Sequence, residues 1–333
     1  MTNTQVVLLM LADVKWGGFV TFNIHMSWAL ERLGFRTVVA KLSPKVSTVQ
    51  FPLGQGVFFR RIDLHSAIKL SRAGRLLITC LYWKQHGEDA LHLLEAGAGV
   101  VLHDPTEYEP GLIAAIKKHG TKVVSIRTKN VANLAALGVR SLFIKHPYVR
   151  WPHSPRARLH HAIGLSRIDW DKHTDEIAQA NAMLAPELRV HLFGAINRMY
   201  EYHKLTSACP GWKDEYRGTF PTTPGAAVEL AAASNWVVDL SAIKGDGGGT
   251  QSTFMEAWDG GAGVVISKKW CTGTDDEMQP GVNCEAVEGP AELARLLAAG
   301  PPSQRVLDGG KAALDHHRPG DVAYAYARFL GWA

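Results

Sequence analysis

Short apolar runs recur along the chain, and most are followed by a stretch with helical spacing. The first run, residues 6–12, leads into a helical pattern over residues 23–33. Apolar runs of this length that alternate with helical stretches are typical of parallel strands in βαβ units. The pattern predicts strands at residues 6–12, 37–42, 76–81, 99–102, 123–126, 141–144, 162–165, 189–193, 236–240 and 263–267.

A segment rich in Pro, Arg and His, residues 147–161, divides this alternation into two halves of similar kind. The prediction is an α/β protein with two Rossmann-like domains facing across a cleft. We place the domains at residues 1–150 and 151–312, with a C-terminal helix in residues 313–333 that packs back on the first domain. Ligands of such sheets bind at the carboxyl ends of the strands, so candidate chemistry is sought there.

Composition narrows the class of protein. Of the 333 residues, 46% are hydrophobic and 20% are charged, which excludes a disordered or fibrous chain. The four cysteines lie far apart with no Cys-x-x-Cys pair, against a disulfide framework and in favour of a reducing compartment. The first apolar run is too short to span a membrane, and no Lys or Arg precedes it as in a signal peptide. We expect a soluble, cytoplasmic monomer.

Positive charge is unevenly distributed. The formal net charge is +5, yet residues 110–168 contain eleven Lys and Arg and no Asp or Glu. A second basic segment contains a single acidic residue, Asp63, and five basic ones: Arg60, Arg61, Lys69, Arg72 and Arg75. Clustered positive charge suits a polyanion such as nucleic acid, or an anionic membrane surface. A solvated basic face, or bases paired with acids from elsewhere in the fold, would give the same pattern.

A glycine pair follows the first predicted strand. The run Asp13-Val14-Lys15-Trp16 ends in Gly17-Gly18 and leads into the helical pattern. Glycines at such a turn let a ligand approach the backbone near the positive end of a helix, although a plain tight turn has the same sequence. The pair is not Gly-x-Gly-x-x-Gly, so it gives little support to nicotinamide or flavin binding.

Two cations, Arg167 and Lys172, follow the first predicted strand of the second half, five residues apart. Across a short loop they can hold both phosphates of one diphosphate, because Arg binds bidentately and Lys acts as a point charge.

A glycine-rich loop, residues 245–249, leads into a predicted helix that carries Glu256. Such a loop presents backbone N–H groups and the helix dipole to a phosphate. Glu256, about two turns into the helix, is placed to accept hydrogen bonds from ribose hydroxyls. The loop lacks the Gly-Lys-Ser/Thr of a P-loop, and a flexible surface loop is the alternative interpretation.

In this order the motifs resemble those of the retaining nucleotide-sugar glycosyltransferases of the GT-B fold. The family has a Gly-Gly loop, a Gly-Arg-Leu-x-x-x-Lys-Gly segment and a Glu-x7-Glu segment. Here they correspond to Gly17-Gly18, to residues 166–173, and to a segment ending in Glu256-Ala257, followed by Gly261 to Val265 and Gly281 to Cys284. The resemblance implies a nucleoside-diphosphate sugar donor, by default a UDP-sugar. One departure concerns the sugar contact, because Gly248 stands where the family has its first Glu and Asp246 lies two residues earlier.

Within that fold the chain also resembles tailed-phage α-glucosyltransferases that modify hydroxymethylated bases in DNA, which would place it in a host cytoplasm. Those enzymes have a His-Asp pair after a strand of the first domain, here His103-Asp104, and an Arg…Trp-Lys segment, here Arg167, Trp170 and Lys172. An aromatic-Gly turn that ends at Arg217-Gly218 would flank the donor base. The resemblance implies transfer with retention to a hydroxyl of a modified base in double-stranded DNA, the base being flipped into the cleft.

These interpretations assign residues to three groups. The catalytic candidates are His103, Asp104, Arg167 and Lys172. The donor-binding candidates are Gly17, Gly18, Arg217, Asp246, Gly248, Gly249, Thr250, Gln251 and Glu256. The candidates for binding the acceptor DNA are Arg60, Arg61, Arg127, Lys129, Lys145, His146, Arg150 and Trp151.

We expect no metal and no further cofactor, because two cations and a helix N-terminus can stabilise the leaving diphosphate. Asp275-Asp276 is interpreted as a surface turn. Three alternatives remain open: the same chemistry on a lipid or small-molecule acceptor, a nucleotide-sugar 2-epimerase, and a DNA-binding protein with an inactive transferase fold.

Overall fold

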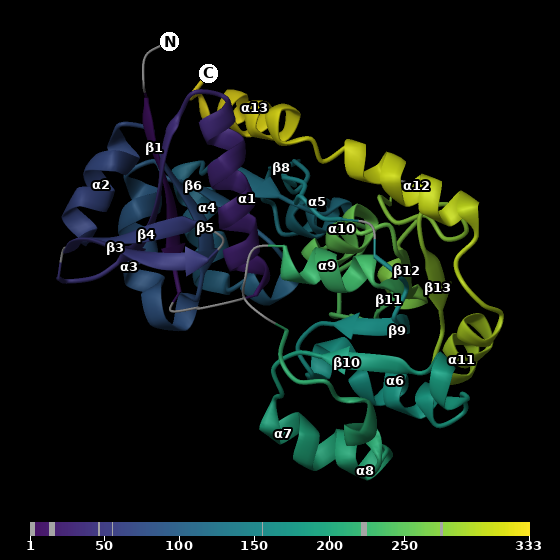
Figure 1. Cartoon of the computed structure of the whole chain (residues 1–333). Helices are drawn as coiled ribbons and strands as arrows, with labels where there is room; N and C mark the ends of the chain where they lie inside the picture. Colours follow the sequence, from purple (N-terminus) through teal and green to yellow (C-terminus); the bar gives the residue numbers. More distant parts are fainter. Residues whose placement is uncertain are drawn as a thin grey trace. The chain divides into compact units, whose positions relative to one another are not determined.

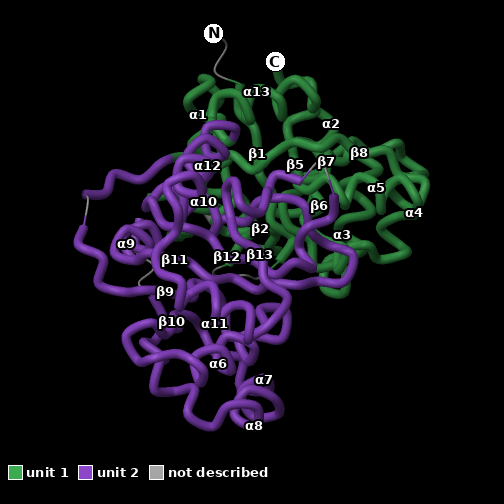
Figure 2. Tube along the Cα trace, turned by 90° about the vertical axis from the view of Figure 1, so that its right-hand side faces the viewer, with its two compact units in different colours: residues 1–149, 317–333 green, residues 150–316 purple. Residues whose placement is uncertain are grey.

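The computed structural model describes residues 4–12, 17–45, 47–54, 56–154, 156–220, 225–273 and 276–333. The chain forms two compact units, coloured separately in Figure 2. Unit 1 comprises residues 1–149 and 317–333, and unit 2 comprises residues 150–316. The predicted α/β class with two sheets of parallel strands is confirmed, whereas the cleft between the two domains stays a prediction.

The sheet of unit 1 has the order β3-β4-β2-β1-β5-β6-β7-β8, and all neighbours are parallel except β3 and β4. The central strands β1 and β5 are buried along almost their whole length, as their continuous apolar sequences require. The strands are β1 (Gln5–Leu11), β2 (Arg36–Leu42), β3 (Ser47–Gly54), β4 (Val57–Ile62), β5 (Leu76–Leu81), β6 (Gly99–Leu102), β7 (Val123–Ser125) and β8 (Ser141–Phe143).

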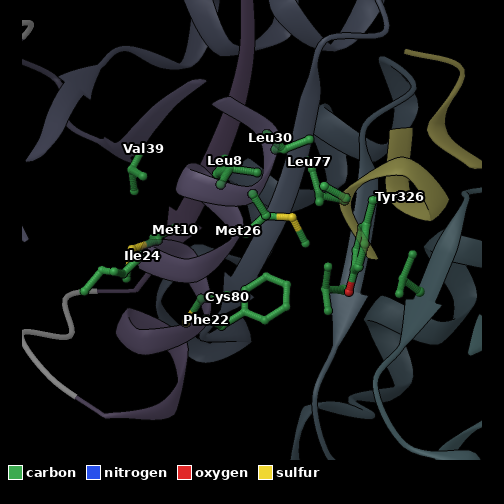
Figure 3. Packing of buried hydrophobic residues seen from close by; sticks show 14 of the residues in the cluster. Leu8, Met10, Phe22, Ile24, Met26, Leu30, Val39, Leu77, Cys80 and Tyr326 are labelled. Atoms are coloured by element: carbon green, nitrogen blue, oxygen red, sulfur yellow. The ribbon is translucent and has the colours of Figure 1, made fainter. Parts of the chain in front are cut away.

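Helices cover both faces of this sheet (Figure 1). On one face, α1 (Gly18–Arg32) packs against β1 and against α13 (Pro319–Leu330). Figure 3 shows Phe22 and Met26 of α1 in this core, with Tyr326 of α13. The other face is covered by α2 (Leu64–Arg72), α3 (Trp83–Glu95) and α4 (Pro110–His119), and α5 (Thr128–Ala136) precedes β8.

The sheet of unit 2 is wholly parallel, in the order β10-β9-β11-β12-β13. Helices α6 (Thr174–Asn181) and α11 (Pro290–Ala298) pack on one face, and α9 (Ala226–Ala232), α10 (Ser252–Asp259) and α12 (Gln304–Asp315) on the other. Two short helices, α7 (Arg198–Tyr200) and α8 (Thr206–Ala208), follow β10. The strands are β9 (His160–Leu165), β10 (Val190–Phe193), β11 (Ser234–Asp239), β12 (Gly263–Ser267) and β13 (Glu285–Val287).

Adjacent parallel strands bring the loops that follow them to one edge of each sheet. In unit 1 the candidates that follow β1, β6, β7 and β8 share such an edge, and in unit 2 so do the loops after β9, β11 and β12. Within the described residues, no helix is both long enough and apolar enough to cross a bilayer.

Candidate functional site

The loop after β9 carries Arg167 at the surface of unit 2. Its guanidinium donates to Asp169 Oδ2 at 2.9 Å and to Asp171 Oδ2 at 3.5 Å, and its side chain is 59% exposed. Asp171 is itself fixed through its carbonyl, which accepts from the N–H of Ala242 at 2.9 Å. The cation is thus exposed on a loop whose backbone is anchored to the segment that follows β11.

Lys172 lies deeper, at the N-terminus of α10. Its ammonium donates to Ser241 Oγ at 2.6 Å and to Oε1 of Gln251, the N-cap of α10, at 3.2 Å. The buried carboxylate of Asp239, at the end of β11, lies 3.6 Å from Lys172 Nζ. Three segments that are distant in sequence therefore meet at one ammonium group, as the carboxyl ends of adjacent parallel strands allow.

The glycine-rich loop is buried and tightly held, unlike the flexible surface loop considered as an alternative. Gly248 N–H donates to the carbonyl of Trp270 at 2.8 Å, and the Trp270 indole donates to the carbonyl of Gly249 at 2.8 Å. At Gly247, φ is 136°, and an added Cβ would lie 2.4 Å from the Trp270 carbonyl oxygen. Glycine is required there for close packing against Trp270. Asp246, the candidate for the sugar contact, is buried beside it.

Thr250 binds a carboxylate of the chain itself. Its N–H and its hydroxyl donate to Glu277 Oε2, at 3.0 Å and 3.2 Å. The residue expected to offer an amide to a phosphate thus already holds an anionic group. Helix α10 begins at Ser252, and the side chain of Gln251 makes no capping bond to the amides of its first turn.

Glu256 lies on α10 in a partly buried position. Burial, and then the nearby Asp259 carboxylate, raises the pKa of Glu256 to about 8. The side chain is therefore mainly protonated at neutral pH. Asp259 accepts from the backbone N–H of Trp151 at 2.9 Å, which places this acceptor candidate beside the same helix.

Arg217 follows the short contact of Tyr216 with β10, the edge strand of unit 2. Its guanidinium donates to the carbonyl of Asp214 at 2.5 Å and to Glu215 Oε2 at 3.1 Å. Tyr216 donates its hydroxyl hydrogen to the carbonyl of Gly194, just after β10, at 3.0 Å. The aromatic-Gly turn therefore lies at the carboxyl ends of the strands, as Arg167 and Lys172 do.

In unit 1, Gly17 and Gly18 begin α1 and are exposed. Gly17 has φ of 103°, and among the described residues no atom lies within 4 Å of a Cβ added at either glycine. The described residues therefore do not crowd these glycines, unlike Gly247. Residues 13–16 of the same loop lie outside the described residues.

His103, directly after β6, is held from several sides. Nε2 of its ring lies 2.9 Å from the Thr79 carbonyl oxygen, and its own carbonyl accepts from Arg127 at 3.2 Å and from Asn130 at 3.0 Å. The rings of Phe19 and Phe22 meet the imidazole edge-on, at 4.7 Å and 5.0 Å between centroids. Burial lowers the pKa of His103 to about 4, so the ring is neutral at physiological pH.

Asp104 and Glu107 shape the turn that follows His103. Asp104 Oδ1 accepts from the N–H and hydroxyl of Thr106, at 2.8 Å and 2.5 Å, and begins a short 3-10 helix. Glu107 is buried and accepts from the His103 N–H at 2.5 Å. Burial, and then the Asp104 charge, raises the pKa of Glu107 well above its usual range.

The acceptor candidates differ in how far their side chains are buried or paired. Arg127 and His146 are buried, and Arg150 pairs with Asp315 at 2.9 Å. Lys129 and Lys145 are partly buried. Arg61, on β4, is exposed with its guanidinium 4.6 Å from the centre of the Phe51 ring, and Arg60 precedes it.

Much of the basic stretch of residues 110–168 is bound to groups of the fold itself. The side chains with such partners include Lys117, Lys122, Arg127, Arg150, Arg156, Arg158 and Arg167. Part of this positive charge therefore stabilises the fold.

The acidic pair expected at a surface turn is only partly visible. Asp275 lies outside the described residues. Asp276 is buried rather than exposed, and its carboxylate accepts hydrogen bonds from Thr272 and Gly273 at 2.5–3.2 Å. The described part of the chain holds no group of three or more His, Cys, Asp or Glu arranged to bind a metal ion.

The sequence did not point to several residues that complete these arrangements, because no motif contains them. They are Phe19, Asn23, Thr79, Glu107, Asp239, Ser241 and Glu277.

Comparison with known proteins establishes the fold alone. No family model and no curated protein sequence matches the chain. Among solved structures, an α-glucosyltransferase in complex with UDP and a 13-mer DNA containing an HMU base is similar, with a TM-score of 0.71 and 12% identity over 99% of this chain and 100% of that one. Anabaena Alr3699/HepE in complex with UDP-glucose has a TM-score of 0.70 and 16% identity over 99% and 100%. S. aureus TarM, in a complex with UDP and alpha-GlcNAc-glycerol, has a TM-score of 0.69 and 9% identity over 98% and 99%. The chain has the GT-B glycosyltransferase fold.

Proposed function

We propose that the protein is a glycosyltransferase that moves a sugar from a nucleoside-diphosphate sugar, by default a UDP-sugar, to a hydroxyl of a hydroxymethylated base in double-stranded DNA. One observation carries the donor assignment. Lys172 Nζ lies 3.2 Å from the side chain of Gln251, the N-cap of α10, with Arg167 exposed in the same loop. A cation beside a helix N-terminus is a preformed place for a phosphate.

Negative charge develops on the leaving diphosphate as its bond to the sugar breaks. In this proposal Lys172, Arg167 and the first-turn amides of α10 stabilise that charge, and such electrostatic stabilisation is usually the largest contribution to catalysis. Arg167 must exchange its contacts with Asp169 and Asp171 for the diphosphate, or share its remaining N–H groups with it. Glu256, neutral at pH 7, can both donate to and accept from a ribose hydroxyl.

His103 would receive the acceptor hydroxyl. The carbonyl of Thr79 can only accept, so Nε2 of the neutral ring carries the proton and Nδ1 keeps its lone pair. With a pKa of about 4 the ring is a weak base, so it orients the hydroxyl rather than storing its proton. In this scheme the O–H bond breaks, the oxygen bonds to the anomeric carbon, and the sugar–phosphate bond breaks. The proton passes to the leaving diphosphate on the same face, which gives retention.

Support for DNA as acceptor comes from the resemblance of the His103-Asp104 and Arg167…Lys172 segments, and from the similar structure that holds UDP and HMU-containing DNA. The similar structure of TarM holds alpha-GlcNAc-glycerol, so the fold alone does not select the acceptor. Arg60 and Arg61 supply positive charge in unit 1 outside the basic stretch of residues 110–168.

The test is to incubate the protein with duplex DNA containing hydroxymethyluracil or hydroxymethylcytosine and with radiolabelled UDP-glucose or UDP-GlcNAc. Label on DNA with one donor, lost in Arg167→Ala, is the expected result. Calorimetric titration with UDP tests the donor site separately, and absence of binding would overturn the donor assignment. If UDP binds and label appears on liposomes instead of DNA, the acceptor is a lipid. If the donor is converted with no acceptor present, the reaction is epimerisation.

A further inference from the structure

The geometry assigns a positioning role to Thr79 and Asn23, which together determine which ring nitrogen of His103 carries the proton. This inference rests on the proposed function in one respect, the role of His103 toward the acceptor hydroxyl. The arrangement itself stands on contacts within unit 1.

The first observation is a β-bulge at the centre of the sheet. Leu9 of β1 pairs with Ile78 of β5, and Met10 pairs with Cys80, so Thr79 is the extra residue. A bulge turns the local backbone out of the regular ladder and often lies beside a functional site. Here the carbonyl oxygen of Thr79 lies 2.9 Å from Nε2 of His103.

The second observation is a buried polar side chain that supports the bulge. Asn23 of α1 and Thr79 are both 0% exposed. The Thr79 hydroxyl donates to Asn23 Oδ1 at 2.8 Å, and Asn23 Nδ2 donates to the carbonyl of Phe19 at 2.8 Å. A buried amide costs free energy unless it is bonded, so Asn23 on the apolar face of α1 calls for a specific reason. Its bonds join the first turn of α1 to the bulge.

The third observation is that the neighbouring side chains hold the imidazole in one orientation. Phe19 and Phe22, from the same helix, bracket the ring, and the backbone N–H of His103 donates to Glu107. A ring flip would set a C–H against the Thr79 carbonyl and lose the hydrogen bond. The Nε2–H tautomer is therefore selected, and Nδ1 is left as the acceptor for a hydroxyl proton.

Thr79→Val tests this assignment, because valine has the same shape as threonine but lacks the hydroxyl that ties the bulge, and with it the Thr79 carbonyl, to Asn23. Thr79→Ser, which keeps the hydroxyl, is the matched control. In protein labelled with 15N-histidine, the shifts of the two imidazole nitrogens report the tautomer, and His103→Gln identifies the His103 signals. We expect a single Nε2–H form in the wild type and in Thr79→Ser, and a mixture of tautomers in Thr79→Val. We also expect kcat to fall by about tenfold or more in Thr79→Val, with KM for the donor unchanged.

Asn23→Ala is a second route to the same result should Thr79→Val fail to fold. A single Nε2–H tautomer and wild-type kcat in either folded variant would overturn the inference, even if its stability fell, because a purely structural role predicts that outcome. The tautomer is read without any substrate. Failure of the proposed function would thus appear as inactive wild type with the tautomer intact, whereas failure of this inference would appear as an unchanged tautomer in the variants.

Discussion

Glu256 couples the stability of unit 2 to pH. Its folded-state pKa, about 8, lies above the ordinary value of 4.5, so the folded protein holds a proton that the unfolded chain releases between these values. Stability from this group is fully present below pH 4.5 and is lost as pH rises toward 8. The loss is on the order of a few kcal/mol, because each pKa unit corresponds to about 1.4 kcal/mol before relaxation.

Glu256→Gln should remove that dependence, because the amide is a neutral isostere. We expect the melting temperatures of the variant and wild type to be similar near pH 5 and the variant to be more stable at pH 9. Thermal unfolding measured across this range tests the expectation. Asp259→Asn, which removes only the smaller cause of the shift, should give a weaker effect of the same sign. Parallel curves for wild type and Glu256→Gln would contradict the assignment.

Lys172 has two separable roles, which a pair of variants can distinguish. Lys172→Met should weaken UDP binding by about 10- to 100-fold, because hydrogen bonds to charged groups contribute about 1.5–3 kcal/mol. It should also destabilise the fold, since the Asp239 carboxylate, fully buried and 3.6 Å away, loses its cation. Adding Asp239→Asn should restore stability but not binding.

Calorimetric titration with UDP and thermal unfolding measure these two effects. Lys311→Met, an exposed site on α12, is the control for loss of one positive charge. Equal UDP affinity in Lys172→Met and Lys311→Met would remove Lys172 from the donor site.

At the scale of single residues, the sequence identifies cations and glycines by their spacing in short motifs. It does not identify their partners, because these are distant in the chain. Thr79 meets Asn23 across 56 positions, and Lys172 meets Ser241 across 69. Such pairs exist only once the strands are placed in order.

At the scale of elements, the buried strands are predictable because each is a continuous apolar run. The pattern missed three strands: β3 and β13, which lie at sheet edges, and β4, which lies between β3 and β2. Strand β3 contains Pro52, is antiparallel to β4, and lies at the edge of its sheet, where proline is tolerated. Strand β13 has only three residues and begins with Glu285, so it forms no continuous apolar run. Edge strands have fewer buried positions, and so their sequences carry a weaker signal.

The two glycine loops differ in what surrounds them, and substitution should expose the difference. The methyl group of Gly18→Ala meets no atom of the described residues within 4 Å and requires no unusual φ, so stability should stay the same or rise by up to about 1 kcal/mol. If the donor approaches this turn, the added methyl group should raise KM for the donor roughly tenfold. Gly247→Ala, in contrast, should destabilise the fold, because its Cβ would lie 2.4 Å from the Trp270 carbonyl.

Thermal unfolding and donor kinetics of the two variants, measured side by side, test this contrast. Unchanged donor KM in a stable Gly18→Ala protein would show that the glycine serves only the turn.

At the scale of the whole molecule, the chain's positive charge divides into a part bound by the fold and a part at the surface. Arg158 donates to carbonyls of Ala231, Ala232 and Gly261, and Arg156 pairs with Glu229. These bases belong to the structure of unit 2, although in sequence they look like part of a polyanion-binding stretch. On β4 of unit 1, exposed Arg61 lies over the Phe51 ring and Arg60 precedes it, a pair of cations that also suits phosphate contact with nucleic acid.

DNA binding should therefore depend on Arg60 and Arg61 and not on Arg156. For duplex DNA, the logarithm of the binding constant falls with the logarithm of salt concentration with a slope of about 0.9 for each phosphate contact. If Arg60 and Arg61 each contact one phosphate, Arg60→Gln/Arg61→Gln should reduce the magnitude of this slope by about 2, whereas Arg156→Gln, whose partner is Glu229, should leave it unchanged. Fluorescence anisotropy of a labelled duplex between about 50 and 200 mM salt measures the slope. UDP affinity should be the same in all three proteins, because Arg60, Arg61 and Arg156 are not among the residues proposed to bind the donor. An equal slope in wild type and the double variant would remove β4 from the DNA-binding surface, and it would leave the assignment of the donor site unaffected.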